Sequence, residues 1–146
     1  MQRTATEGTG VTHENTEENR HAYRKVFFET PDFNKSIGGV ILHAETLLSE
    51  PTVQPLVAAG VVLGIKTDKG LKAAEGLLEG EQSTKEGLVG LEERSKEFYA
   101  KGARFAKWRT VLALGKDMPS QASYDDVSDV LAEYALVSQK VLILHD

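Results

Sequence analysis

The sequence predicts an α/β fold in which about three to four parallel strands are joined by crossover helices. Short apolar runs alternate along the chain with segments of helical periodicity, and the order is strand, helix, strand, helix, strand, helix, strand. Such a series favours a parallel sheet with right-handed connections. The predicted strands cover residues 37–42, 60–65, 103–112 and 141–144.

The first two predicted strands, Ile37–Leu42 and Gly60–Ile65, are apolar without alternation. This pattern is typical of a parallel strand that is buried on both faces. Ala103–Leu112 alternates small or apolar residues with charged ones, which suits a third strand. Val141–Leu144 is a short apolar run and predicts a fourth strand.

Three longer segments predict helices, with one short helix between the first two strands. In His13–Phe28, acidic residues precede basic ones, which suits the helix dipole, and either Thr12 or Asn15 can be the N-cap. A short helix over His43–Ser49 is expected to stop at Pro51. The other two helices are amphipathic and cover 84–99 and 124–139.

The domain organisation predicted from these patterns is simple. Residues 1–12 show no apolar period and predict a mobile N-terminal arm. Residues 13–146 form one domain, in which 71–80 reads as a loop.

Composition excludes several classes of protein. The formal net charge of −5 counts against a nucleic-acid surface, which needs a clustered basic face. The longest apolar run, Val57–Ile65, is shorter than the roughly 20 residues of a membrane-spanning helix. The absence of cysteine excludes a disulfide scaffold, and the four histidines have no metal-ligand spacing. The polar N-terminal segment lacks the apolar core of a signal peptide, so we expect a cytoplasmic protein.

Positively charged residues gather at the expected carboxyl ends of two strands. Lys66 follows the second strand directly, and Lys107 and Arg109 lie two residues apart on the third. Because side chains alternate along a strand, Lys107 and Arg109 are predicted to share one face with Phe105. Cations brought together in a sheet crevice need an anionic partner, and a phosphate is the simplest. The pattern therefore predicts a phosphate site.

A simpler structural alternative remains open on the pattern alone. These cations can face solvent at the edge of the sheet and pair with Asp68 and neighbouring acids. The glycine pair at Gly38–Gly39 does not add a phosphate loop, because it precedes a strand instead of joining a strand to a helix. A free-standing, doubly wound phosphate-binding domain is therefore disfavoured.

Four segments together resemble the class I fructose-bisphosphate aldolase family. They are E-N-T-E-E-N-R at 14–20, I-G-G-V-I-L at 37–42, G-I-K-T-D-K-G at 64–70 and F-A-K-W-R at 105–109, and they stand in the family's order. The resemblance extends from about residue 12 to about residue 139. It implies a partial (β/α)₈ TIM barrel and reversible cleavage of fructose 1,6-bisphosphate into two triose phosphates in glycolysis, without a metal or other cofactor.

The resemblance also implies roles for individual residues. It assigns Lys107 a catalytic role in charge stabilisation during carbon–carbon cleavage. It assigns Arg20, Lys66 and Arg109 to binding of the sugar phosphate, either fructose 1,6-bisphosphate or a triose phosphate.

The chain departs from the family's pattern at both ends. A complete barrel of this type takes about 250 residues, whereas this sequence has 146. It lacks the first barrel strand and the C-terminal half, which carries the lysine that forms the Schiff base. We therefore expect no turnover by this chain alone. The alternative is a non-catalytic fragment that binds phosphate or associates with full-length aldolase subunits.

Overall fold

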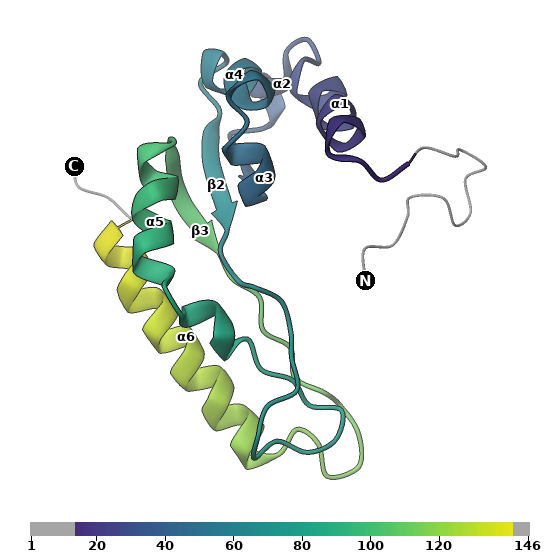
Figure 1. The fold of residues 1–146 in the computed structure, drawn as a ribbon, viewed down its shortest axis with the longest axis vertical. Coiled ribbons are helices and arrows are strands. Elements are labelled where there is room, and N and C mark those ends of the chain that lie inside the picture. Colours follow the sequence, from purple (N-terminus) through teal and green to yellow (C-terminus); the bar gives the residue numbers. More distant parts are fainter. Residues whose placement is uncertain (1–13, 142–146) are drawn as a thin grey trace.

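The structure, a computed structural model, describes residues 14–141 and contains one open, three-stranded parallel sheet. Its strands are β1 (Gly39–Leu42), β2 (Val62–Lys66) and β3 (Ala103–Lys107), arranged in that order (Figure 1). The predicted α/β class is confirmed, and three strands with helical crossovers are consistent with part of an α/β barrel. The predicted arm and domain boundary at residue 12 lie outside the described residues.

Helices cover one face of this sheet and leave the other exposed. The described helices are α1 (Glu17–Phe28), α2 (Phe33–Ser36), α3 (Ala44–Leu47), α4 (Glu50–Ala58), the 3₁₀ helix η1 (Lys85–Leu88), α5 (Leu91–Ala100) and α6 (Gln121–Val141). Leu63 and Ile65 point from β2 into a core that includes Leu56 of α4 and Phe98 of α5. On the opposite face, the side chain of Ile41 is about half exposed, at 51%.

The first helix begins later than predicted. Its N-cap is Thr16, whose hydroxyl accepts a hydrogen bond from the backbone N–H of Asn19 at 3.2 Å, so neither Thr12 nor Asn15 has that role. A hydroxyl at this position satisfies an N–H that has no partner within the helix. The end of α1 at Phe28 agrees with the prediction.

The prediction that Pro51 only stops a helix was incomplete. The short helix before it is present as α3, but Pro51 also lies in the first turn of α4. Proline is tolerated there because the first N–H groups of a helix have no intrahelical partner. The sequence pattern therefore missed a helix that covers the core between β1 and β2.

The single predicted helix over 84–99 was also wrong in its extent, because the chain forms η1 and then α5. Val89 is extended, and Gly90 adopts a positive φ of 66°, which separates the two helices. The guanidinium of Arg94 donates hydrogen bonds to the carbonyls of Gly87 and Val89, which stabilises the break. Glycine adopts this left-handed conformation at little steric cost, and here it begins α5.

The third strand is shorter than predicted, since β3 ends at Lys107 and not at Leu112. Its register with β2 shifts between Leu63 and Gly64, so Arg104 lies between two paired positions as a β-bulge. The fourth predicted strand begins at Val141, but that residue closes α6. The rest of the run, 142–144, lies outside the described residues.

Two long loops extend from the carboxyl ends of β2 and β3, on the side of the sheet below the strands in Figure 1. Trp108, in the loop after β3, makes one of the contacts between these loops and the helices, and its indole Nε1 donates to Thr84 Oγ1 at 2.9 Å. The ring of Trp108 also packs against Tyr134 of α6, with centroids 5.0 Å apart. This side chain therefore joins both loops to α6 next to the carboxyl ends of the strands.

Candidate functional site

Two of the predicted site residues, Lys66 and Lys107, meet at one carboxylate at the carboxyl end of the sheet. They are register partners on β2 and β3. Lys66 Nζ donates to Asp68 Oδ1 at 2.7 Å and to the backbone carbonyl of Asp68 at 3.0 Å. Lys107 Nζ lies 4.0 Å from Asp68 Oδ2. Two ammonium groups from neighbouring strands thus flank a carboxylate whose side chain is 1% exposed.

The local sequence explains why these groups converge. The backbone N–H of Thr67 donates to the carbonyl of Lys107 at 3.1 Å, which extends the pairing of β2 and β3 by one residue. The ring of Phe105 covers Gly64, two residues before Lys66 on the same face of the sheet. Parallel strands end at the same edge, so the residues at these ends share one surface.

The two lysines remain accessible, with 26% of the Lys66 side chain and 35% of the Lys107 side chain exposed. The cations pair with Asp68 and are partly exposed to solvent, as the simpler alternative held. Their convergence at one strand end is the arrangement that the phosphate site also requires, and that site stays a prediction.

Arg109 lies beyond β3, which is shorter than the strand on which the prediction of a face shared with Lys107 rested. Because β3 ends at Lys107, the alternation of side chains does not reach Arg109. The residue is exposed, and within 14–141 its guanidinium has no hydrogen-bond or ion-pair partner. Arg109 lies next to the lysine pair in sequence, but the structure does not join it to Asp68.

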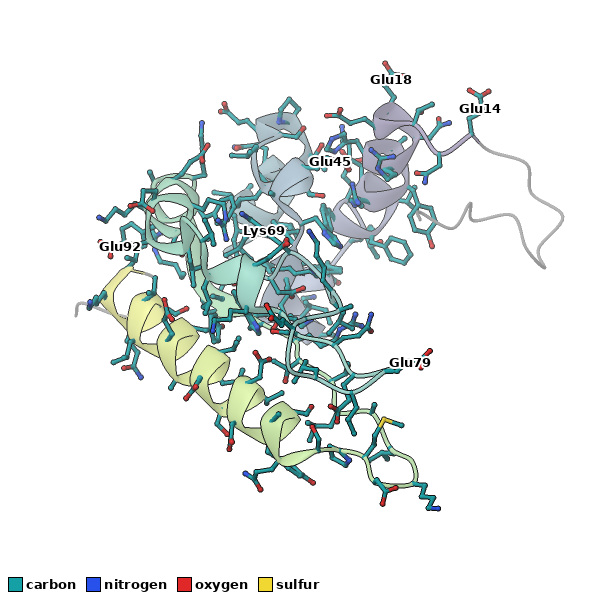
Figure 2. The ribbon with its side chains drawn as sticks, turned by 60° about the horizontal axis from the view of Figure 1, so that its bottom comes forward. Glu14, Glu18, Glu45, Lys69, Glu79 and Glu92 are labelled. Carbon is teal, nitrogen blue, oxygen red and sulfur yellow. The ribbon has the colours of Figure 1, made fainter. Side chains whose placement is uncertain are left out.

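Arg20 belongs to a different cluster, centred on Glu45 of α3. Its guanidinium donates to Glu45 Oε1 at 3.0 Å and to Oε2 at 2.5 Å, and Arg24 Nη1 donates to Oε1 at 2.6 Å. Figure 2 shows Glu45 beside α1, the helix that carries both arginines. The hydrogen bonds from Arg20, with Arg24, lower the pKa of Glu45 to about 2. The structure therefore does not bring Arg20 to the lysine pair.

His43 connects the two clusters electrostatically. It follows β1 directly and lies within electrostatic range of Lys66 and Arg24. Burial, followed by the positive charge of Lys66, lowers the pKa of His43 below its ordinary value. His43 is consequently biased toward its neutral form.

The sequence prediction missed His43 and Glu45, which follow β1 at the carboxyl end of the sheet. It treated Asp68 only as a neutralising partner. One signal in the sequence was available: charged residues follow all three strands, and the prediction used only two of these strand ends. His43 and Glu45 occupy the end of β1 in the same way that Lys66 and Asp68 occupy the end of β2.

The remaining chemistry of the described chain is limited. Between residues 14 and 141, no three histidine, aspartate or glutamate side chains gather closely enough to hold a metal ion. No helix in that range is both long and apolar enough to cross a membrane. The arrangement is suited to binding an anion through Lys66 and Lys107, since ammonium groups are compact positive donors.

The fold and these strand ends define a class: a parallel α/β protein with part of a barrel sheet and cationic residues at its carboxyl end. Residues 4–144 match the family model described as class-I fructose-bisphosphate aldolase. The chain belongs to this family, and the resemblance stated from the sequence is confirmed.

Individual relatives agree with this assignment. A probable fructose-bisphosphate aldolase class 1 of Xanthomonas campestris pv. campestris is 42% identical over 137 residues, covering 90% of this chain and 40% of that protein. Cytosolic fructose-bisphosphate aldolase 6 of Arabidopsis thaliana is 45% identical, covering 87% of this chain and 36% of that protein. The chain thus spans well under half the length of these relatives.

A solved structure shares the fold. It is fructose-bisphosphate aldolase from Plasmodium falciparum in complex with TRAP and a small-molecule inhibitor, with a TM-score of 0.86 and 42% sequence identity. The similarity covers 92% of this chain and 40% of that one.

Proposed function

We propose that this chain carries a sugar-phosphate site of a class I fructose-bisphosphate aldolase, with Lys66 and Lys107 as its central cations. The observation that supports the proposal most directly is the convergence of both ammonium groups on Asp68 at the carboxyl end of the sheet. In barrels of this type, ligands bind at that end. The proposed ligand is fructose 1,6-bisphosphate or a triose phosphate, as in the reversible cleavage that gives the family its name.

The two predicted arginines enter this proposal differently. Arg109 is exposed and has no partner among the residues described, so its planar guanidinium is available to a phosphate. Arg20 is held by Glu45, and it would have to leave that carboxylate to reach a ligand. Lys107 carries the proposed catalytic role, stabilising charge near the bond that breaks.

Calorimetric titration of the chain with fructose 1,6-bisphosphate tests the proposed site. We expect Lys66→Met and Lys107→Met each to weaken binding by about tenfold, since each removes one charged hydrogen-bond donor. Arg20→Met should have a smaller effect. The matched control is Lys101→Met, the exposed residue that caps α5 two residues before β3, which should bind as the wild type does. Equal affinities for all four variants would contradict the proposal.

For catalysis, we propose that these 146 residues alone do not cleave the substrate. None of their lysines matches the family's imine-forming lysine, and without an imine there is no electron sink for the carbanion that cleavage creates. Incubation with substrate and borohydride should therefore trap no covalent adduct. Mass-spectrometric detection of an adduct on Lys66 or Lys107 would contradict this expectation.

A second function is favoured by the uncovered face of the sheet, where Ile41 and Val62 are 51% and 45% exposed. The chain can act as a non-catalytic module that associates with longer aldolase subunits through this face. Co-purification of the tagged chain with a full-length aldolase would support it. We propose no nucleic-acid or membrane partner, and a cytoplasmic location, the compartment named for the Arabidopsis relatives.

A further inference from the structure

We propose that Asp68 is a positioning residue that holds the ammonium groups of Lys66 and Lys107 together for the ligand. This inference rests on the proposed function and adds a residue to it. In the sequence, Asp68 reads only as a neutralising partner, whereas in the structure it is the most buried member of the group.

The contact with Lys66 fixes one of the two cations. Lys66 Nζ donates to both Oδ1 and the backbone carbonyl of Asp68, at 2.7 and 3.0 Å. Oδ1 also accepts the backbone N–H of Gly70 at 3.1 Å, which fixes the carboxylate itself. A charge-assisted bond to a buried and anchored acceptor leaves the ammonium little freedom.

The second carboxylate oxygen faces the other cation. Asp68 Oδ2 is buried and has no hydrogen-bond partner in the described part of the chain. Its nearest cation is Lys107 Nζ, at 4.0 Å, too long for a hydrogen bond. The buried carboxylate oxygen keeps this ammonium near Lys66 by electrostatic attraction, and because no hydrogen bond fixes it, Lys107 can still turn toward a bound phosphate.

The net charge of this group makes the proposal testable, because positioning and simple neutralisation predict opposite changes in anion affinity when Asp68 loses its charge. Two ammonium groups and one carboxylate carry a net charge of +1, and removal of the carboxylate charge raises it to +2. If Asp68 only neutralised charge, its loss would strengthen anion binding through simple Coulomb attraction. If Asp68 positions the lysines, its loss weakens binding although the site becomes more positive.

The experiment measures fructose 1,6-bisphosphate affinity of Asp68→Asn by calorimetry. The asparagine oxygen can still accept from Lys66 and Gly70, which preserves the loop, but its amide N–H₂ no longer attracts Lys107. We expect about a tenfold loss of affinity. The charge-matched control, Asp129→Asn on the exposed surface of α6, should bind as the wild type does. Unchanged or tighter binding by Asp68→Asn would overturn the proposal.

A double-mutant cycle distinguishes positioning from a general structural role. Once Lys107 has been replaced by methionine, Asp68→Asn should cost little further affinity, because asparagine still accepts from Lys66 and the attraction that it loses acted mainly on Lys107. A loss of the same size in both backgrounds would mean that Asp68 acts only on the loop, and would overturn the proposal.

A ligand-independent measurement separates this inference from the proposed function. The side-chain ammonium of Lys66 should give a protected ¹⁵N signal by NMR in the wild type, and Asp68→Ala should lose it. If the wild type binds no fructose 1,6-bisphosphate, the proposed function fails, and the Lys66 signal alone tests whether Asp68 positions that lysine. Persistence of the signal in Asp68→Ala would overturn the inference. If the lysine variants lose affinity and Asp68→Asn does not, the function stands and the inference falls.

Discussion

At the scale of single residues, Gly64 shows how a missing side chain shapes the site. A Cβ at this position would lie 2.3 Å from two atoms of the Phe105 ring. The ring therefore occupies the space above β2 only because residue 64 is glycine. This packing lies two register positions before Lys66 and Lys107, on the same face of the sheet, so we expect it to stabilise the part of the sheet that carries both lysines.

Gly64→Ala is expected to lower the free energy of unfolding by about 1–3 kcal/mol, because a methyl group would overlap the ring. Urea denaturation followed by circular dichroism measures the change. Gly38→Ala is the control, since nothing lies within 4 Å of a Cβ there. The double variant with Phe105→Leu should recover part of the lost stability, and a Gly64→Ala protein as stable as the wild type would refute the packing argument.

Glu45 makes the stability of the N-terminal half depend on pH. Arg20, followed by Arg24, lowers its pKa from 4.5 to about 2 in the folded chain. A carboxyl group with a lowered folded pKa contributes stability above the unfolded pKa and loses it as pH falls through the folded value. The loss is therefore expected between about pH 4.5 and pH 2.

Glu45→Gln should lower the free energy of unfolding at pH 7 by about 1 kcal/mol, a figure reduced for the partial exposure of all three side chains. Between pH 4.5 and 2, the variant should lose less stability than the wild type does. Denaturation curves at several pH values test this, with Glu18→Gln on the exposed side of α1 as the control. Parallel pH profiles for wild type and Glu45→Gln would contradict the assignment.

At the scale of elements, Trp108 couples the loop after β3 to two helices. Its Nε1–H donates to the buried hydroxyl of Thr84, which precedes η1, and its ring packs on Tyr134 of α6. Trp108→Phe is expected to cost about 1–3 kcal/mol, because the Thr84 hydroxyl loses its partner in a buried place. Hydrogen exchange should become faster in η1 and in α6 around Tyr134. The control is Tyr124→Phe, at an exposed position of α6, which should leave the exchange rates in both regions unchanged. Faster exchange of Trp108→Phe in only one of the two regions would contradict the coupling.

The elements also show what the sequence could and could not predict. Short apolar runs predicted β1 and β2, and apolar periodicity predicted β3 and the long helix α6, since both signals depend on which faces of an element are buried. The wrong helix boundaries lie where the backbone conformation of proline or glycine determines where a helix begins or ends. Pro51 lies in the first turn of α4 as well as following α3, and Gly90 separates one amphipathic pattern into two helices. The alternating pattern placed both Lys107 and Arg109 on the third strand, but β3 ends at Lys107, and nothing in the local pattern shows that the strand ends between them. Arg20 was attributed to the ligand by resemblance alone, and its contact with Glu45 depends on how α1 and α3 pack, which a linear pattern does not contain.

At the scale of the whole molecule, the two faces of the sheet differ in what they contribute to stability. Ile65 points from β2 into the helical layer and is 0% exposed, whereas Ile41 points from β1 to the open face and is 51% exposed. The same residue type thus occupies a core position and an uncovered position in one small sheet. Open edges and exposed apolar faces favour association with another chain.

This contrast gives a prediction that needs only matched substitutions. Ile65→Ala should lower the free energy of unfolding by about 2–5 kcal/mol, as for a fully buried isoleucine, whereas Ile41→Ala should change it by much less.

Ile41→Thr combined with Val62→Thr should instead reduce self-association of the chain, measured by sedimentation velocity over a range of concentrations. Because both positions lie on the face opposite the helical layer, this variant should still unfold at nearly the wild-type urea concentration. A large loss of stability in Ile41→Ala would mean that something covers this face in the isolated chain, and an unchanged sedimentation profile for the double threonine variant would mean that association uses another surface.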